Sequence, residues 1–302
     1  MLAQLQRGVM LMLALVAATW LLIGWSAGHP VIGVLGVMLL SFGYTVVLAA
    51  EFAMLVCVHG GDPTPRARCG ELVRAWLSEC VVAWQVFVWR QPFRADRWPD
   101  VPGRPGVRGI VFVHGYVCNR GLWSPWLERC TAEHRPCVAV SLEPVFSELD
   151  VYVPQIEQAV ARLERETGLP PLVVCHSMGG LVVRAWLATT PGADKRVDHV
   201  VTIATPHRGT WLARLGRTAN VLHMRSSSDW LAALKAREAA TLAARFTCFY
   251  SHADNIVFPP RAATMAGADN RHLRATAHMA MAFHPQVVAE VARRIGGGDA
   301  VA

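Results

Sequence analysis

Charged side chains are scarce in this sequence, and several motifs of cofactor-dependent enzymes are missing from it. Charged residues make up 17% of the 302 positions, against an apolar fraction of 53%, and this composition favours a membrane-linked protein over an average soluble domain. There is no C-x-x-C pair, no H-E-x-x-H and no glycine-rich phosphate loop, which argues against zinc ribbons, thioredoxin-type sites, zincins and nucleotide-binding loops. The sequence therefore implies neither a metal nor an organic cofactor.

The positive charge also lacks the pattern of a nucleic-acid-binding protein. The net charge is +7, and almost all cationic side chains are Arg, but no basic stripe is interleaved with aromatic residues. The arginines are expected to face anionic lipid headgroups or solvent. No nucleic-acid partner is expected, and the sequence identifies no protein partner.

The 8 cysteines are scattered. Three lie in apolar stretches and are expected to be buried thiols: Cys57, Cys80 and Cys175. Three others share one short segment and would pair only in an oxidising compartment: Cys118, Cys130 and Cys137. The compartment must therefore be inferred from the topology of the chain.

Two long uncharged runs lie near the amino terminus. Residues 9–25 and 31–50 contain no charged side chain, and a membrane span takes about 20 apolar residues, with a lower limit near 17. The runs predict a transmembrane hairpin within residues 1–60. The competing interpretation is a signal peptide formed by the first run. Only Arg7 precedes that run and a second full span follows at once, which favours the hairpin.

The flanking charges predict the orientation of this hairpin. The turn between the runs carries no Lys or Arg, whereas Arg66, Arg68 and Arg74 follow the second run. Because basic residues favour the cytoplasmic side, we expect a multi-pass protein of the cell inner membrane with its catalytic domain in the cytoplasm. The three arginines would then lie near anionic headgroups, Glu51 would lie at the interface, and no disulfide is expected.

Residues 61–108 are expected to form an interfacial helix and a linker. Within them, residues 71–90 are strongly apolar with a helical pattern, and Trp76, Trp84 and Trp89 suit the headgroup level. The same helix would also suit packing on the domain that follows. A stretch rich in Pro, Gly and Arg then indicates the linker.

From residue 109 the pattern changes to alternating strands and helices. Strands are expected at residues 110–115, 136–142, 172–177, 199–206 and 247–254, with a last short strand near residue 272. Helices are expected at residues 122–134, 149–168, 179–191 and 285–295. Such alternation predicts a parallel sheet with both faces covered, here over residues 109–302. Ligand sites in such sheets lie at the carboxyl ends of the strands.

The segment C-H-S-M-G-G at residues 175–180 follows one of these strands. It nearly matches G-x-S-x-G, the strained strand-to-helix turn that exposes a nucleophilic serine. Gly179 and Gly180 supply small neighbours after Ser177, and Cys175 replaces a glycine by a larger but still small residue. Ser177 is therefore the predicted nucleophile. Cys175 lies one pleat deeper in the sheet, and a buried thiol forms little thiolate.

Five segments in order resemble the α/β-hydrolases of the bacterial lipase and esterase type. FVHGY, with His114 and Gly115, resembles the His-Gly segment after strand three. CHSMGGLVVR resembles the serine turn, with His176 next to the serine. TIATPHRGT resembles the segment after strand six. YSHADNIVFPP resembles the acid-bearing loop, and ATAHMAM resembles the loop of the catalytic histidine. The resemblance covers about residues 109–302. It implies an α/β-hydrolase fold, preceded here by the two transmembrane helices.

A serine nucleophile needs a base to take its proton and a third group to hold that base. In this fold the order along the chain is serine, acid, histidine. Asp254 directly follows an aromatic strand and is the expected acid. Four other acids look solvated: Asp198, Asp229, Glu238 and Asp269.

Among the histidines, His278 is the expected base because it follows the last short strand. His284, at the entry to the final helix, is the alternative, and His272 belongs to the strand itself. His176 adjoins the serine but is expected to face the opposite side of its strand, and His207 is expected to shape its own loop.

The developing oxyanion needs two donors. The backbone N–H of Met178 is one, and the resemblance implies that of Tyr116 as the other. Residues 210–245 form a long connection with amphipathic helical stretches. They are expected either to cap the site or to pack as ordinary helices.

These features predict a membrane-anchored serine carboxylic-ester hydrolase, an esterase or lipase that acts through an acyl-enzyme on a lipid or a small ester. An acyltransferase or thioesterase with the same triad is the alternative enzyme. A catalytically inactive hydrolase fold serving as a membrane scaffold is the alternative of another class. The acyl chain length is set by the shape of the pocket, which the sequence does not reveal.

Overall fold

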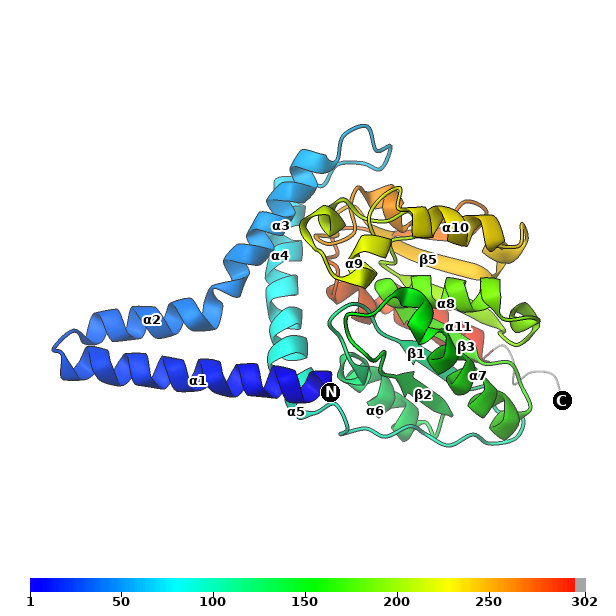
Figure 1. Cartoon of the computed structure of the whole chain (residues 1–302), viewed down its shortest axis with the longest axis horizontal. Coiled ribbons are helices and arrows are strands. Elements are labelled where there is room, and N and C mark those ends of the chain that lie inside the picture. Colours follow the sequence, from blue (N-terminus) through cyan, green and yellow to red (C-terminus); the bar gives the residue numbers. More distant parts are fainter. Residues whose placement is uncertain (297–302) are drawn as a thin grey trace.

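A parallel sheet between layers of helices forms the body of the molecule, and a helical arm projects from it (Figure 1). The computed structural model describes residues 1–296; residues 297–302, which the sequence assigns to the second domain, lie outside the described residues. The six strands follow the order β2-β1-β3-β4-β5-β6, and every neighbouring pair is parallel. This arrangement confirms the expected α/β architecture. The strands are β1 (Ile110–Val113), β2 (Cys137–Val140), β3 (Leu172–His176), β4 (His199–Ile203), β5 (Phe246–Ser251) and β6 (Asp269–Leu273).

The central strands are apolar along their whole length because helices cover both faces of the sheet. Val111 and Val173 face one side, while Phe112 and Val174 face the other. The first face packs against α7 (Val153–Thr167) and α8 (Met178–Thr189), and the second against α6 (Ser124–Ala132) and α11 (Pro285–Gly296).

The connection between β4 and β5 is helical. It contains η5 (Trp211–Leu215), α9 (Ala219–His223), α10 (Asp229–Arg237) and η6 (Leu242–Arg245). Helix α10 packs on α8, and α9 packs on the short helical turn η3 (Leu149–Tyr152). The other short turns are η2 (Arg120–Trp123), η4 (Ala193–Lys195), η7 (Pro260–Ala263) and η8 (Ala280–Phe283).

The arm begins with a helical hairpin that extends away from the body (Figure 1). Helix α1 (Leu2–Ser26) packs against α2 (Pro30–Phe42), and α3 (Tyr44–Val58) continues toward the body. The second uncharged run does not form one straight span as expected, because α2 and α3 are bent by 47° around Gly43. Glycine is a common site of helix kinks, and a Cβ here would lie 2.6 Å from the carbonyl oxygen of Leu39.

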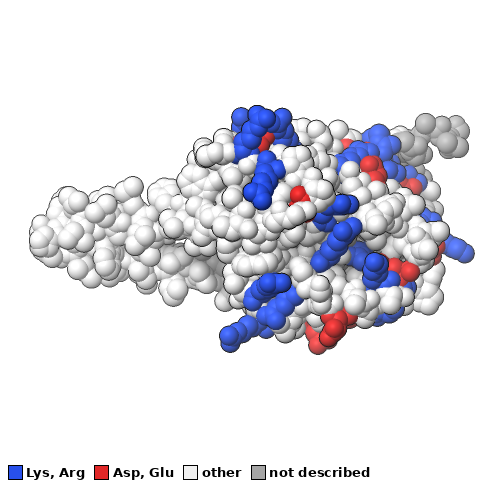
Figure 2. Space-filling view, turned by 90° about the horizontal axis from the view of Figure 1, so that it is seen from above, with Lys and Arg blue, Asp and Glu red and all other residues white. Residues whose placement is uncertain are grey.

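Among residues 1–296, two helical stretches are long and apolar enough to cross a membrane, Leu2–Ser26 and Cys69–Phe93, and the bent pair α2–α3 would make a third. In the most apolar stretch of α1 only 6% of residues are buried. Figure 2 shows the projecting hairpin without Lys, Arg, Asp or Glu on the face in view, whereas charged side chains gather over the body. The hairpin therefore offers an uncharged surface to its surroundings.

The second of these stretches consists of α4 (Cys69–Ala83), η1 (Trp84–Arg90) and α5 (Gln91–Phe93). One face is buried against the body and the neighbouring helices, through Ala75, Glu79 and Val86. The other exposes Trp84 at 46% and Trp89 at 49%. Of the two sequence interpretations, packing on the domain is observed, and the exposed face keeps the composition of an interfacial helix.

The cysteines are all free. Cys118, Cys130, Cys137 and Cys175 are buried. Cys57, which the sequence suggests is buried, is instead exposed on α3, because that helix turns other residues, such as Phe52, toward the body.

Candidate active site

Ser177 occupies the sharp turn between β3 and α8. Its backbone has φ 53° and ψ −128°, a conformation that is rare for residues other than glycine and is associated with functional sites. The turn is held by hydrogen bonds from Ser177 N–H to the carbonyl of Ile203 (2.8 Å) and from Gly180 N–H to the carbonyl of Ser177 (3.1 Å). The carboxyl end of a central strand therefore presents this serine at the edge where ligand sites form.

The glycines around the turn are required by close approach. A Cβ on Gly179 would lie 2.5 Å from the carbonyl oxygen of His114, and one on Gly180 would lie 2.2 Å from Oγ1 of Thr205. A Cβ on Gly115 would lie 2.8 Å from Cβ of Ser177. The position two before the serine tolerates a larger residue, because the side chain of Cys175 packs in the core between the sheet and α8. Burial raises the pKa of that thiol.

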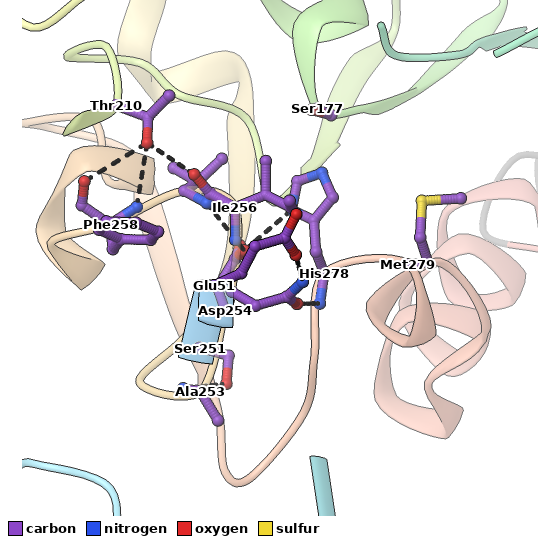
Figure 3. Close-up of polar contacts among 12 residues, drawn as sticks. Glu51, Ser177, Thr210, Ser251, Ala253, Asp254, Ile256, Phe258, His278 and Met279 are labelled. Atoms are coloured by element: carbon purple, nitrogen blue, oxygen red, sulfur yellow. Dashed lines mark hydrogen bonds and ion pairs between the residues drawn. The ribbon is translucent and has the colours of Figure 1, made fainter. Parts of the chain in front are cut away.

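Asp254 and His278 form a buried pair beside the serine (Figure 3). His278 Nδ1 lies 2.9 Å from Oδ1 of Asp254, and the same oxygen accepts the backbone N–H groups of Ile256 and Val257, each at 2.9 Å. An ionised carboxylate oxygen accepts hydrogen bonds and donates none, so Nδ1 carries the proton toward Asp254. In neutral His278, Nε2 is then the acceptor.

Ser177 and His278 line the same cavity, and Figure 3 shows the ring of His278 between Asp254 and Ser177. Within residues 1–296 no hydrogen bond joins the Ser177 hydroxyl to His278. Catalytic hydrogen bonds are often long or poorly aligned in ligand-free enzymes and tighten with substrate. Ser177 and His278 therefore share a cavity without the hydrogen bond that a proton transfer between them would need.

The electrostatic surroundings favour the protonated form of His278. Burial alone would lower its pKa, but the Asp254 charge and hydrogen bond oppose this, with smaller contributions from Glu79 and Glu51, and the pKa of His278 is raised above its ordinary value. An imidazole with an acidic partner is a stronger base than an isolated one. This is the direction expected for a group that must take a proton from a hydroxyl.

The other histidines have different partners. His284 lies at the entry to α11, where its Nδ1 accepts the N–H of Gln286 at 3.2 Å. His114 is fixed by the carbonyl of Gly115 (2.8 Å) and the N–H of Leu142 (2.9 Å), and burial lowers its pKa to about 4.

His207 is buried in its loop. Its carbonyl accepts a hydrogen bond from Nη1 of Arg184 at 2.8 Å, and its Nε2 lies 3.0 Å from Oγ1 of Thr202. It is therefore part of the loop framework rather than of the cavity beside Ser177.

His176 does not face away from the site, contrary to the expectation from strand alternation. It lines the cavity with Ser177, and its Nε2 lies 3.1 Å from the backbone carbonyl of His278. The reason is that the chain leaves the strand at the Ser177 turn, so the alternation ends there. Burial lowers the pKa of His176 to about 3, and the neutral ring donates to the carbonyl of the adjacent loop.

Backbone donors lie on both sides of the serine. Within residues 1–296, neither the N–H of Tyr116 nor that of Met178 has a hydrogen-bond acceptor. Met178 begins α8, where the first N–H groups of a helix have no partner in the helix. Both amides are thus available to a negatively charged oxygen placed next to Ser177.

One of the acids expected to be solvated is not. Glu238 is partly buried, with a side chain that is 9% exposed, and binds Arg184 through two hydrogen bonds of 2.6 and 3.1 Å. Asp198 pairs with Arg108 and Asp269 with Arg271 at the surface. In the described part of the chain, no group of three or more His, Cys, Asp or Glu residues is arranged to hold a metal ion.

The cavity beside Ser177 has a volume of about 310 Å³, and the arm supplies one of its walls. No residue of 210–245 lines it, because α9 and α10 pack on η3 and α8 instead. The covering residues come from α3, α4 and η1: Leu48, Glu51, Glu79, Ala83 and Phe87.

The sequence did not predict that three further polar residues line the cavity beside Ser177. Glu51, which the sequence places at a membrane interface, faces Asn255, and Glu79 lies against the loop after His278. The signal for both acids was present, because each is an isolated carboxylate in a strongly apolar helix. Asn255 directly follows the expected acid in the sequence.

Comparisons with known proteins agree with this fold. Residues 110–298, more than half of the chain, match the family described as the alpha/beta hydrolase family. Among solved structures, the mature form of the Bacillus licheniformis lipase BlEst2 is similar at 15% identity and TM-score 0.56, covering 65% of this chain and 95% of that one. Its propeptide form is similar at 16% identity and TM-score 0.54, covering 64% and 52%.

A monoacylglycerol lipase from Paleococcus ferrophilus is similar at 16% identity and TM-score 0.44, covering 64% of this chain and 96% of that one. No curated protein sequence matches significantly. At such low identities the likeness to the two BlEst2 structures establishes the fold alone, whereas the family match covers the strands, the serine turn and the loops of Asp254 and His278. The chain therefore belongs to the alpha/beta hydrolase family.

Proposed function

We propose that this protein is a membrane-anchored serine hydrolase of carboxylic esters, with Ser177, His278 and Asp254 as its catalytic triad. One observation carries the proposal. The serine in a strained strand-to-helix turn opens into the same cavity as a histidine that is held by a buried aspartate. This is the relationship of nucleophile, base and orienting group that defines such enzymes.

In the proposed reaction, Oγ of Ser177 attacks the ester carbonyl carbon while Nε2 of His278 takes the hydroxyl proton. The negative charge on the carbonyl oxygen is stabilised by the N–H groups of Tyr116 and Met178. When the tetrahedral species collapses, the C–O bond breaks and Nε2 returns the proton to the leaving alcohol. Water then attacks the acyl-enzyme by the same route and releases the carboxylic acid.

The membrane part of the proposal assigns the hairpin of residues 1–60 as the anchor and residues 109–302 as the catalytic domain, joined by residues 61–108. The uncharged surface of the projecting hairpin supports it, as does the exposed apolar face of η1 with Trp84 and Trp89. A lipid ester is the proposed substrate, because Leu48, Ala83 and Phe87 from this arm line the cavity. Orientation with the domain in the cytoplasm follows from Arg66, Arg68 and Arg74.

A fluorophosphonate probe tests the enzyme class on the full chain. Labelling of the wild type, absent in Ser177→Ala, is the expected result. Absence of labelling in a folded wild type would instead favour the inactive scaffold. Adding an alcohol or thiol acceptor during turnover of an ester then separates hydrolysis from acyl transfer, since an acyltransferase would give mostly the transfer product.

A further inference from the structure

Two carboxylates from the arm reach the loops that carry the catalytic residues. Glu51 lies on α3 and Glu79 on α4, and both line the cavity beside Ser177. Within residues 1–296 neither forms an ion pair with Lys, Arg or His. Ionisable groups in strongly apolar helices are costly and generally mark functional sites with a specific partner. Here the partners are groups of the hydrolase body.

Glu79 holds the backbone immediately after His278. Its side chain is 1% exposed, and the N–H of Met279 lies 2.9 Å from Oε1 and 3.1 Å from Oε2. The N–H of Ala280 donates to Oε2 at 3.2 Å. Both oxygens therefore accept, as an ionised carboxylate does. These contacts fix the start of η8 and, with it, the position of the preceding His278.

Glu51 acts on the same histidine through one intermediate residue. Its Oε2 accepts a hydrogen bond of 2.6 Å from Nδ2 of Asn255. That bond leaves Oδ1 of Asn255 oriented toward the backbone N–H of His278, which donates to it at 3.2 Å. Figure 3 shows Glu51 close to Asp254 and His278. His278 is thus held through its own N–H and through the two that follow it.

We propose that Glu79 and Glu51 are positioning residues for His278, so that the membrane arm completes the catalytic site instead of serving only as an anchor. The inference rests on the proposed triad. It explains why, in the described part of the chain, the only two acidic residues that line this cavity come from apolar helices. It also makes the geometry of the base depend on how α3 and α4 pack on the body.

The two acids also contribute charge. The charged and titratable groups that face His278 are Asp254, Glu79, Glu51 and the ring of His176, whose centroid lies 4.7 Å away. Negative charge on the first three favours the imidazolium, and the neutral His176 adds none. Burial raises the pKa of Glu79 to about 7, so Glu79 contributes this charge in its ionised form. Removing one arm carboxylate should therefore make His278 easier to deprotonate, and this effect is separable from folding.

The test uses full-length variants in lipid nanodiscs, with the number of active sites counted by fluorophosphonate labelling. Glu79→Gln loses an acceptor oxygen and a charge, whereas Glu51→Gln retains an acceptor for Asn255 and loses only the charge. Glu51→Ala loses both. Ser78→Ala, an exposed position next to Glu79 on α4, is the matched control. Hydrolysis of a soluble ester is measured per labelled site across pH.

We expect Glu79→Gln and Glu51→Ala to lower kcat per labelled site by about 10-fold, the effect of losing one hydrogen bond to a charged group. Glu51→Gln should keep kcat within about 3-fold of the wild type, the effect of a weak hydrogen-bond change. In all three the acidic limb of kcat/KM should move to lower pH, and Ser78→Ala should match the wild type.

Variants with fewer labelled sites, but with wild-type kcat per site and an unmoved acidic limb, would show a purely structural role and overturn the inference. If Glu79→Gln does not fold, the two Glu51 variants decide alone. A wild type that neither labels nor hydrolyses esters would instead refute the proposed function, so the two failures are distinct.

Discussion

His278 and Asp254 meet through a single oxygen atom. Oδ1 of Asp254 accepts His278 Nδ1–H and two backbone N–H groups, whereas Oδ2 has no partner within residues 1–296 although it is buried. The carboxylate is therefore fixed by its own loop before the histidine binds it. This fixes the tautomer of the imidazole and leaves Nε2 directed to the cavity, where a serine proton can be accepted.

The first prediction separates the two histidines that follow Asp254 in the sequence. His278→Ala removes the only histidine bonded to Asp254, and we expect kcat to fall by about 10⁴- to 10⁶-fold, because the members of a triad act as a unit. His284→Ala removes a side chain whose bond is to the N–H of Gln286, so activity should change by less than about 3-fold. Ester hydrolysis by equal amounts of folded protein measures both. A severe loss in His284→Ala with a mild one in His278→Ala would reverse the assignment.

The second prediction concerns pH. The proposed reaction needs neutral His278, and the pKa of His278 is raised, so kcat/KM should fall as pH drops through a value above 6.5, the ordinary value for histidine. The sign follows from the base role, since protonation blocks Nε2. A kcat/KM profile of a substrate that does not ionise measures it. An acidic limb well below pH 6 would contradict the raised pKa.

The positions of the central strands and the serine turn were predictable from sequence because they depend on local patterns. The apolar runs ending at residues 113, 176 and 203 become adjacent parallel strands, and α7 ends at Gly168, which adopts φ 73°. Local patterns of this kind predict structure well, because a buried parallel strand requires apolar residues and a left-handed helix end favours glycine.

The covering of the site was not predictable in the same way. The sequence offers residues 210–245 as a cap, yet Leu48, Glu79 and Phe87 of the arm line the cavity. The neighbouring residues of an apolar helix do not determine whether its polar residue contacts water, a lipid headgroup or a loop distant in the sequence. Glu79 and Met279 are separated by 200 positions, and only the packed structure reveals that one carboxylate satisfies N–H groups of the other segment.

The third prediction tests the steric demand of the serine turn. Gly179→Ala places a Cβ 2.5 Å from the carbonyl oxygen of His114 and 2.6 Å from that of Val113, and backbone atoms cannot move aside cheaply. Alanine is intrinsically better than glycine in a helix by about 1 kcal/mol, so a loss of stability must come from the clash. We expect a loss of about 1–3 kcal/mol.

Gly70→Ala in α4 is the control for this substitution, since a Cβ there meets nothing within 4 Å. Thermal unfolding in detergent compares the two variants with the wild type. Equal melting temperatures for Gly179→Ala and Gly70→Ala would mean that the turn relaxes without cost and that glycine is not needed at position 179.

The last prediction concerns the side of the membrane, because the compartment decides which esters reach Ser177. The hairpin places an even number of spans before the catalytic domain, and Arg66, Arg68 and Arg74 then favour the cytoplasm. Each basic residue near an anionic leaflet adds about 1 kcal/mol of attraction, which would hold the body against the inner face. If Cys69–Phe93, the other stretch long enough to span, crossed as well, the number would become odd and the domain would move outside. Its buried face against the body, which contains Glu79, argues that it lies at the interface.

A green fluorescent protein fused after Ala302 should therefore fluoresce, while alkaline phosphatase at the same position should be inactive. Active phosphatase with a dark fluorescent fusion would place the domain outside and require either a third span or removal of the first run.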